Sequence, residues 1–323
     1  MAADIPAFTL NDGTKMPSVG MGCWMGGYGG GQRVNAMVKK ALQAGYRHFD
    51  TAAGYGNEEQ VGAALRESGI PREELYVVTK LGGDKHARVH EAFEESLSKL
   101  GLDYIDLYLV HWPQAENDTE EVLKPHEAPT IVDTWKDMEK LLDTGKVKSI
   151  GVSNFSVKTL TELLPHAKVI PAANQVEMHP FLPQYELQKF CEEKGILITA
   201  YSPLGQPPAV GKEGVPSLLT NPTILSIAKE RGVTPAQVLL SWGVQRGTAV
   251  IPKSENEERM KANITLVKLS DAETQGIDAE HKKPGLHRSL LSYHSVIDGK
   301  GAVFGWTYEQ LGWNLTKGGV VPS

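Results

Sequence analysis

Short apolar segments alternate with segments of helical periodicity along most of this chain, and the alternation limits its possible folds more than any other feature. The intervals carry helical spacing, for example Val34, Val38 and Leu42 followed by a stop at Gly45. About eight such repeats predict either a parallel (β/α)8 barrel or a doubly wound sheet. A polar or aromatic residue stands at or directly after the end of each apolar segment along the whole chain. The segments end at Trp24, Asp50, Lys80, His111, Ser153, Gln175, Tyr201 and Pro252. This distribution favours the TIM barrel, because a doubly wound sheet concentrates its site at one switch point.

The two ends of the chain depart from the strand–helix pattern. Phe8–Leu10, the turn 11–13 and Thr14–Met16 predict an N-terminal β-hairpin within residues 1–17. Residues 284–323 show no strand–helix unit, and we expect them to wrap the barrel and close one side of a pocket. No domain boundary separates these parts, so the sequence predicts a single barrel domain over residues 1–323.

Local signals add further expectations. Asn57 and Gln60 have the spacing of a capping box, and Thr234-Pro235 predicts the start of another helix. Three connections, 25–31, 113–129 and 205–222, exceed the usual loop length and follow predicted strands, so we expect them at the active rim.

Composition excludes several classes of function. The net charge is -6, with no basic segment typical of nucleic-acid binding, and no apolar run approaches the ~18 residues of a membrane span. Only Cys23 and Cys191 are present and no secretory signal is evident, which favours a reducing, cytoplasmic location. His86 and His90 are four residues apart but lack the carboxylate of a zinc-binding motif, so no metal is expected. Composition does not determine the oligomeric state, and a monomer or weak dimer is expected.

Four of the residues at or just past these strand ends form a chemically coherent set. A phenol such as Tyr55 is too weak an acid at neutral pH, and an ammonium such as Lys80 stabilises its phenolate. Asp50 would keep the lysine charged, and His111 would orient a carbonyl oxygen. The set can donate a proton to a carbonyl while another group supplies hydride. A Schiff-base role for Lys80 in an aldolase-like barrel is the alternative within enzymes.

The motifs around these residues resemble those of the aldo-keto reductase family. They are GYRHFDTAAGYGNE at 45–58, VVTK ending at Lys80, LVHWP around His111, IGVSNF around Ser153, IPKS ending at Ser254, and Arg259. The resemblance runs in the family's order from residue 20 to residue 263. It implies a TIM barrel that binds an extended nicotinamide dinucleotide, in agreement with the absence of a Rossmann GxGxxG motif in a βαβ setting.

By this resemblance, Ser153, Asn154 and Gln175 would hold the carboxamide of the nicotinamide, and Tyr201 would stack on its ring. Ser202 and Leu204 would line the pyrophosphate, with the third long loop folded over it. The remaining expected cofactor contacts are Lys253, Ser254 and Arg259 at the 2′-phosphate, Asn263 at the adenine, and Gly22, Cys23, Trp24, Asp50 and Ile251.

Lys253 and Arg259 place two cations and Ser254 a hydroxyl around one anion, which favours NADPH/NADP+ over NADH. Glu255 is the complication. A carboxylate turned inward at that position would repel the phosphate and permit NADH as a weaker alternative.

We expect Trp24, Tyr55, His111 and Trp112 to line a pocket for a small-molecule carbonyl substrate. Gly82 stands where family members often have tryptophan, which would open the pocket. The tail segment FGWTYEQLGW resembles that of fungal members, which implies small hydroxyaldehydes, aldoses or sugar acids as substrates. Trp306 and Trp313 could contact substrate, but a role in fixing the tail is favoured. The predicted activity is reversible NADPH-dependent reduction of aldehydes or ketones with Tyr55 as general acid. A non-catalytic NADP-binding sensor or accessory module on the same fold is the alternative.

Overall fold

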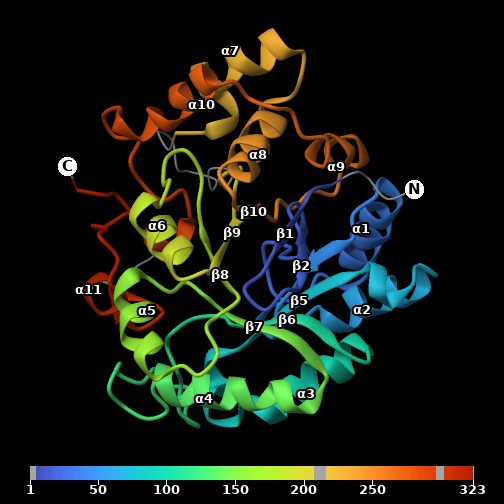
Figure 1. Ribbon diagram of the computed structural model, residues 1–323, viewed down its shortest axis with the longest axis vertical. Helices are drawn as coiled ribbons and strands as arrows, with labels where there is room; N and C mark the ends of the chain where they lie inside the picture. Colours follow the sequence, from blue (N-terminus) through green and yellow to red (C-terminus); the bar gives the residue numbers. More distant parts are fainter. Residues whose placement is uncertain (1–4, 207–215, 296–301, 323) are drawn as a thin grey trace.

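Eight parallel strands follow one another in sequence order around the centre of the protein (Figure 1). The computed structural model describes residues 5–206, 216–295 and 302–322. A parallel bridge between Val19 and Val250, with the Gly20 N–H donating to the Val250 carbonyl at 2.9 Å, joins the first and last strands and closes the barrel. The predicted (β/α)8 barrel is therefore confirmed. Its strands are β3 (Met21–Gly22), β4 (His48–Asp50), β5 (Tyr76–Leu81), β6 (Ile105–Val110), β7 (Val147–Ser153), β8 (Ala173–Glu177), β9 (Leu197–Tyr201) and β10 (Ala249–Val250).

Helices surround the barrel; most bury one face in the cluster shared with the strands, whereas the helices over residues 222–231 and 271–278 pack in a separate cluster. In the first helix the buried face includes Val34, Val38 and Ala41, and Gly45 ends the helix in the left-handed conformation, as its spacing predicts. The helices of the described residues are α1 (Gly31–Ala44), α2 (Glu58–Glu67), α3 (Val89–Leu100), α4 (Ile131–Leu141), α5 (Val157–Leu163), α6 (Tyr185–Glu193), α7 (Pro222–Arg231), α8 (Pro235–Gln245), α9 (Glu257–Asn263), α10 (Asp271–Asp278) and α11 (Tyr308–Leu311).

One predicted helix start is correct in position and wrong in its contacts. Asn57 is the N-cap residue of α2, but its side chain makes no capping hydrogen bond. Its amide instead bonds to Thr51 and to the Cys23 carbonyl. In contrast, Thr234 caps α8 through a reciprocal capping box with Gln237. The capping-box prediction at Asn57 fails because tertiary partners take up both ends of the amide.

Alternation along the strands sets which side chains enter the barrel. In β5 and β6, Val77 and Tyr108 pack in the cluster shared with the helices, whereas Val78 and Leu109 pack in a separate cluster inside the barrel. Because side chains alternate with period two, Lys80 follows Val78 on the interior side. His111 follows Leu109 and Asp50 follows His48 in the same way. The interior of the barrel therefore changes from apolar to ionisable toward its carboxyl end.

The N-terminal hairpin closes the opposite end of the barrel. Strands β1 (Ala7–Thr9) and β2 (Lys15–Pro17) pair antiparallel, as predicted. Leu10 and Met16 pack in the interior cluster against the residues that begin β5 and β8, Tyr76 and Ala173. The hairpin thus seals the amino end with apolar side chains, and only the carboxyl end is available for a polar site.

The C-terminal segment packs on the second long loop. It contains the short strands β11 (Ala302–Val303) and β12 (Trp306–Thr307) and helix α11. Trp306 is buried, and its indole N–H donates to the Leu123 carbonyl at 2.7 Å. Gln114 donates to the Val303 carbonyl at 2.7 Å. These contacts fix the tail to the loop, which is the role favoured for Trp306.

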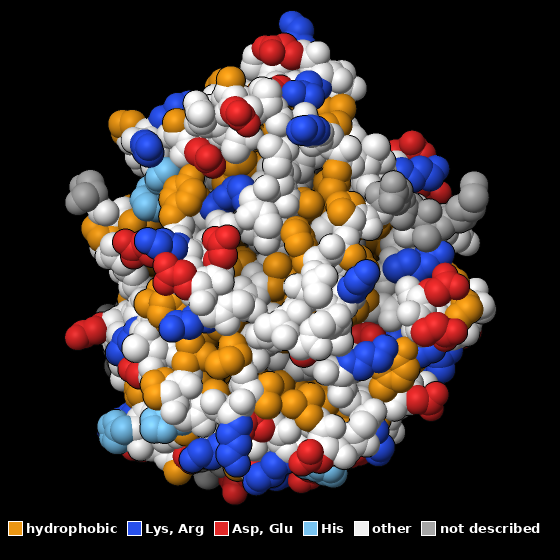
Figure 2. Space-filling view, in the orientation of Figure 1, with side chains coloured by type: hydrophobic (Ala, Val, Ile, Leu, Met, Phe, Trp, Pro, Cys, Tyr) orange, Lys and Arg blue, Asp and Glu red, His pale blue; other side chains and the backbone are white. Residues whose placement is uncertain are grey.

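Surface charges on the face shown in Figure 2 are interspersed, with Lys and Arg next to Asp and Glu and hydrophobic side chains in the hollow between them. Among the described residues, no helix combines the length and apolar composition needed to cross a bilayer.

Candidate active site

Asp50, Tyr55, Lys80 and His111 meet at the carboxyl rim of the barrel. Asp50 ends β4, Lys80 lies near the end of β5, His111 follows β6, and Tyr55 ends a short 3-10 turn after β4. The Lys80 Nζ donates to Asp50 Oδ1 at 2.5 Å and to the Tyr55 hydroxyl at 3.5 Å. The rings of Tyr55 and His111 are 5.7 Å apart between centroids. The structure therefore brings together the four residues that the sequence singled out.

Burial controls the charge state of this group. Burial lowers the pKa of Lys80, but Asp50 and Tyr55 more than offset it, so the pKa of the ammonium is raised. Burial raises the pKa of Tyr55 by more than Lys80 lowers it. Burial and then Lys80 hold the pKa of His111 well below its ordinary value, so the imidazole is neutral at pH 7. The lysine acts on the phenol in the direction expected from the sequence, but the net pKa of Tyr55 is raised rather than lowered.

Thr51 and Asn57 hold the turn that carries Tyr55. The Thr51 hydroxyl donates to Asn57 Oδ1 at 2.7 Å, and Asn57 Nδ2 donates to the Cys23 carbonyl at 2.8 Å. The Thr51 carbonyl also accepts a hydrogen bond from Lys80 at 2.8 Å. Neither residue was predicted to belong to the site, although both lie within the GYRHFDTAAGYGNE motif.

The glycine-rich first loop contacts the same turn. The Gly29 N–H donates to the Tyr55 carbonyl at 2.7 Å. Gly26, Gly29 and Gly30 all have φ between 86 and 98°, where side chains are strained. This backbone requirement explains the run of glycines. It also places the exposed Tyr28 directly over Gly56, next to Tyr55.

The residues expected around the nicotinamide gather at the ends of β7, β8 and β9. Ser153 Oγ donates to the Gln175 carbonyl at 2.8 Å, and the Tyr201 hydroxyl donates to Asn154 Oδ1 at 2.7 Å. Gln175 Nε2 donates to Asp50 Oδ2 at 2.7 Å, which connects this group to the four residues above. Tyr293 of the tail, whose hydroxyl lies 3.3 Å from that of Tyr201, was not anticipated from the sequence.

The other expected cofactor residues lie on the same rim. Ser202 adopts a positive φ of 48°, and Leu204 is partly buried at the start of the third long loop. Residues 207–215, expected to fold over the pyrophosphate, lie outside the described residues. Gly22, Cys23 and Ile251 are buried. Burial raises the pKa of the Cys23 thiol, which agrees with a packed side chain rather than a reactive one.

At the far end of the expected dinucleotide site, Lys253 and Arg259 are exposed and Ser254 is buried, accepting a hydrogen bond from the Asn256 N–H at 3.2 Å. Asn263 is buried, with its side-chain oxygen unpaired. The hydroxyl and amide groups of Ser153, Asn154 and Gln175 lie at one end of the expected site, and the cations Lys253 and Arg259 lie at the other. This arrangement suits a dinucleotide with a 2′-phosphate.

Aromatic side chains wall the space above Tyr55. The Trp24 ring lies 5.0 Å from that of Tyr55. Trp112 contacts three rings of the tail, Tyr293 at 5.9 Å, Phe304 at 4.7 Å and Trp313 at 5.9 Å. The tail therefore contributes to the pocket wall through Trp112.

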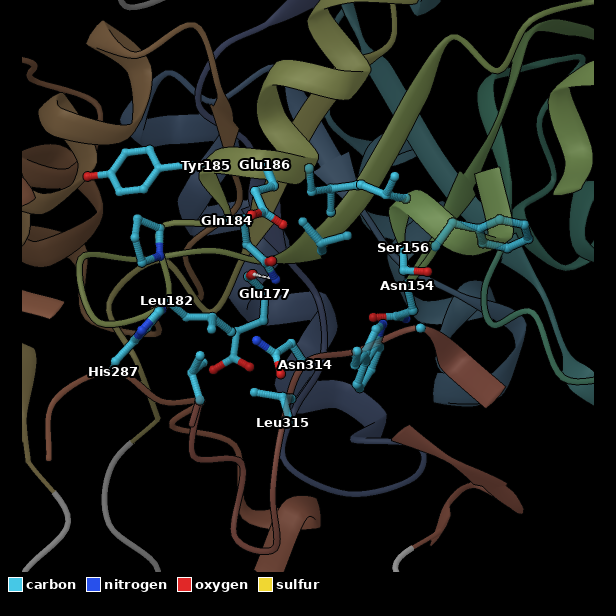
Figure 3. Close-up of a pocket in the computed structure, with 18 of the residues that line it drawn as sticks. Asn154, Ser156, Glu177, Leu182, Gln184, Tyr185, Glu186, His287, Asn314 and Leu315 are labelled. Atoms are coloured by element: carbon cyan, nitrogen blue, oxygen red, sulfur yellow. Dashed lines mark hydrogen bonds between the residues drawn. The ribbon is translucent and has the colours of Figure 1, made fainter. Parts of the chain in front are cut away.

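A cavity of about 410 Å³ adjoins the nicotinamide-side residues, between β8, α6 and the tail (Figure 3). Asn154 and Tyr201 are part of its lining, whereas Tyr55, Lys80 and His111 are not. The buried Glu177 carboxylate on its wall accepts hydrogen bonds from Ser289 Oγ at 2.6 Å and from the Leu290 N–H at 2.8 Å. This carboxylate ties the tail to the barrel.

The two histidines considered for metal binding do not face each other. His86 is buried in a 3-10 segment with its ring 3.1 Å from the Thr134 hydroxyl, whereas His90 is exposed on α3. Over residues 5–206, 216–295 and 302–322, no group of three or more His, Cys, Asp or Glu side chains is arranged to hold a metal ion.

Comparison with known proteins agrees with this architecture. Residues 18–281 match the Aldo/keto reductase family. The chain is 46% identical over 319 residues to the D-galacturonate reductase of Hypocrea jecorina, covering 95% of this chain and 96% of that protein. It is 44% identical over 300 residues to the glycerol 2-dehydrogenase (NADP(+)) of Saccharomyces cerevisiae, covering 87% and 92%.

A solved structure shares the fold. The crystal structure of a Bombyx mori aldo-keto reductase in complex with NADP superposes with a TM-score of 0.80 at 38% identity, covering 86% of this chain and 93% of that one. A closed parallel barrel with its polar site at the carboxyl rim has the architecture of a TIM-barrel enzyme. The chain belongs to the aldo-keto reductase family, and it is an NADP-dependent oxidoreductase acting on carbonyl groups.

Proposed function

We propose that the protein reduces small hydroxyaldehydes, aldoses or sugar acids to alcohols, with Tyr55 as the proton donor, and that it also catalyses the reverse oxidation. The observation that carries the proposal is the buried contact chain from Asp50 through Lys80 to the Tyr55 hydroxyl. No other arrangement described on the rim combines an acid, a cation that stabilises its conjugate base and a neutral imidazole.

The chemistry follows from the charge states. The Tyr55 hydroxyl donates a hydrogen bond to the carbonyl oxygen and transfers its proton as charge develops there. The Lys80 ammonium stabilises the resulting phenolate, and Asp50 keeps Lys80 protonated. The neutral His111 donates a second hydrogen bond that orients the carbonyl.

NADPH, when bound, supplies the hydride. Its 2′-phosphate would be held by Lys253, Ser254 and Arg259, and its carboxamide by Ser153, Asn154 and Gln175, with Tyr201 against the ring.

The substrate class is inferred from the pocket and from the relatives. The galacturonate and glycerol enzymes named above act, by their names, on a sugar acid and a small polyol. Trp24 and Trp112 supply apolar walls around the reacting carbon. A cytoplasmic monomer or weak dimer remains a prediction.

The two alternative functions predict different behaviour. A Schiff-base lysine must be neutral to attack a carbonyl, but Lys80 is fully buried and paired with Asp50, which keeps it protonated. A sensor module would bind NADPH without turnover.

The test is NADPH oxidation with glyceraldehyde by the wild type and by Tyr55→Phe, with NADH as the second cofactor. We expect turnover to fall at least about 100-fold in Tyr55→Phe, the usual contribution of general acid catalysis, while NADPH binding persists. Tyr28→Phe, which removes an exposed hydroxyl next to the site, is the matched control and should keep wild-type turnover. Tight NADPH binding with no turnover by the wild type over a panel of aldehydes would support the sensor module instead.

A further inference from the structure

Arg33 at the start of α1 reaches across to Glu255 in the loop after β10. The two residues are 222 positions apart in the sequence. The segments that carry them are neighbours because the barrel closes between them, where the Gly22 N–H donates to the Pro252 carbonyl at 3.2 Å. The contact is therefore set by barrel closure rather than by local sequence.

The guanidinium holds both oxygens of the carboxylate. Arg33 Nε lies 2.5 Å from Glu255 Oε2, and Arg33 Nη2 lies 2.6 Å from Oε1. The Lys253 ammonium contacts Oε1 as well. Glu255 thus lies between two cations, and the hydrogen bonds from Arg33 and then Lys253 lower the pKa of its carboxyl to about 2. The carboxylate is charged at every pH of interest.

This arrangement matters because Lys253 is the lysine proposed to hold the 2′-phosphate of the cofactor. A free carboxylate beside Lys253 would neutralise it and would repel a phosphate dianion. A bidentate guanidinium fixes the position of the carboxylate and cancels its charge. With Arg33 present, the three side chains carry a net charge of about +1, and without it they carry none.

We propose that Arg33 is a specificity-determining residue that favours NADPH over NADH by fixing and neutralising the Glu255 carboxylate beside the 2′-phosphate site. This inference rests on the proposed position of the 2′-phosphate at Lys253, Ser254 and Arg259. Arg33 on α1 would thus compensate for the negative charge of Glu255 in the loop after β10.

The pair is suited to mutation. The Arg33 side chain is 63% exposed and that of Glu255 is 30% exposed, so their attraction contributes little to folding stability. Substitutions should leave the barrel intact. Lys40 on the same helix makes a similar exposed pair with Glu257 at 3.2 Å and provides a matched control, Lys40→Ala, for removal of one positive charge.

The experiment measures dissociation constants for NADPH and NADH by quenching of tryptophan fluorescence in the full-length protein. We expect Arg33→Ala to weaken NADPH binding about five-fold, because the Glu255 carboxylate, no longer held by the guanidinium, then repels the phosphate dianion; one unit charge at about 8.5 Å from a dianion in a water-like dielectric has an effect of this size. NADH binding should stay within about two-fold. Lys40→Ala should change neither constant by more than about two-fold.

A double-mutant cycle separates the proposed role from direct contact with the phosphate. In a Glu255→Gln background, Arg33→Ala should no longer weaken NADPH binding, because the carboxylate that it restrains is absent. If the five-fold loss persists in that background, Arg33 acts on the phosphate itself and the proposal is wrong. Equal losses for NADPH and NADH would also overturn it, since they would indicate damage to the loop.

Lys253→Met distinguishes failure of this inference from failure of the site on which it rests. If Lys253→Met abolishes the preference for NADPH while Arg33→Ala has no effect, the phosphate site stands and the role of Arg33 is refuted. If Lys253→Met leaves the preference unchanged, the proposed phosphate site itself is wrong.

Discussion

Replacing Lys80 with methionine tests whether the buried cation is the source of the acidity of Tyr55. Methionine keeps most of the apolar stem and removes only the charge. At the observed 3.5 Å between Lys80 Nζ and the Tyr55 hydroxyl, an effective dielectric constant of about 20 gives an attraction of about 5 kcal/mol between ammonium and phenolate. Only part of this energy reaches the transition state, because proton transfer is incomplete there. We therefore expect kcat for glyceraldehyde reduction to fall about 100- to 1,000-fold in Lys80→Met.

The same substitution has a second effect, on stability. Asp50 is 1% exposed, and without Lys80 its carboxylate keeps the hydrogen bond from Gln175 but loses its counter-charge. Breaking a buried pair by removing one partner costs about 3–5 kcal/mol. The free energy of unfolding, measured by urea denaturation, should fall by about this amount.

Steady-state assays at saturating NADPH, together with NADPH binding by fluorescence, measure the catalytic effect on folded protein. Lys99→Met, on the exposed face of α3, is the matched control and should behave as wild type, because its ion pair with Glu95 is solvent-exposed. A Lys80→Met variant that folds, binds NADPH and keeps kcat within three-fold of wild type would refute the role assigned to the cation.

Three further outcomes are expected elsewhere in the protein. Burial lowers the pKa of His86 to about 4, so the folded state resists protonation of this imidazole. Its contribution to the free energy of unfolding is fully present above the unfolded pKa near 6.5 and should fall by about 3 kcal/mol as the pH drops to 4. Urea titrations should show a smaller loss for His86→Gln. Trp306→Ala removes a buried indole and its bond to Leu123, and should lower the unfolding free energy by about 3–5 kcal/mol in the same assay. Gly29→Ala places a residue with a side chain at a positive φ and strains the hydrogen bond to the Tyr55 carbonyl. We expect a lower kcat at unchanged NADPH affinity. An unaltered kcat would contradict a positioning role for the first loop.

The sequence predicted those features that depend on short-range periodicity. Lys80 and His111 were found because each occupies the interior position at or just past the end of a continuous apolar strand, and all such ends meet at one rim. The strand boundaries were less reliable at the shortest strands. β3 ends at Gly22, before Trp24, and β10 ends at Val250, before Pro252.

What the sequence could not predict depends on which side chains meet in space. Asn57 has the spacing of a helix cap, and only the folded loop shows that Thr51 and the Cys23 carbonyl take its amide. Glu255 was recognised as a problem for the phosphate, but the arginine that pairs with it lies at the other end of the chain. The net pKa of Tyr55 depends on burial, which no local pattern measures.

The way the barrel closes affects where it should open locally. β3 and β10 are each two residues long and meet through few backbone pairs, whereas β5 and β6 pair over four residues. A barrel should open first along such a seam. The residues proposed to hold the cofactor flank this seam on both sides, Gly22 and Trp24 on one and Lys253 and Ser254 on the other. A bound dinucleotide would then contact both sides of the seam and hold them together. Amide hydrogen exchange at Gly22 and Val250 should therefore slow on addition of NADP+ more than exchange within β6.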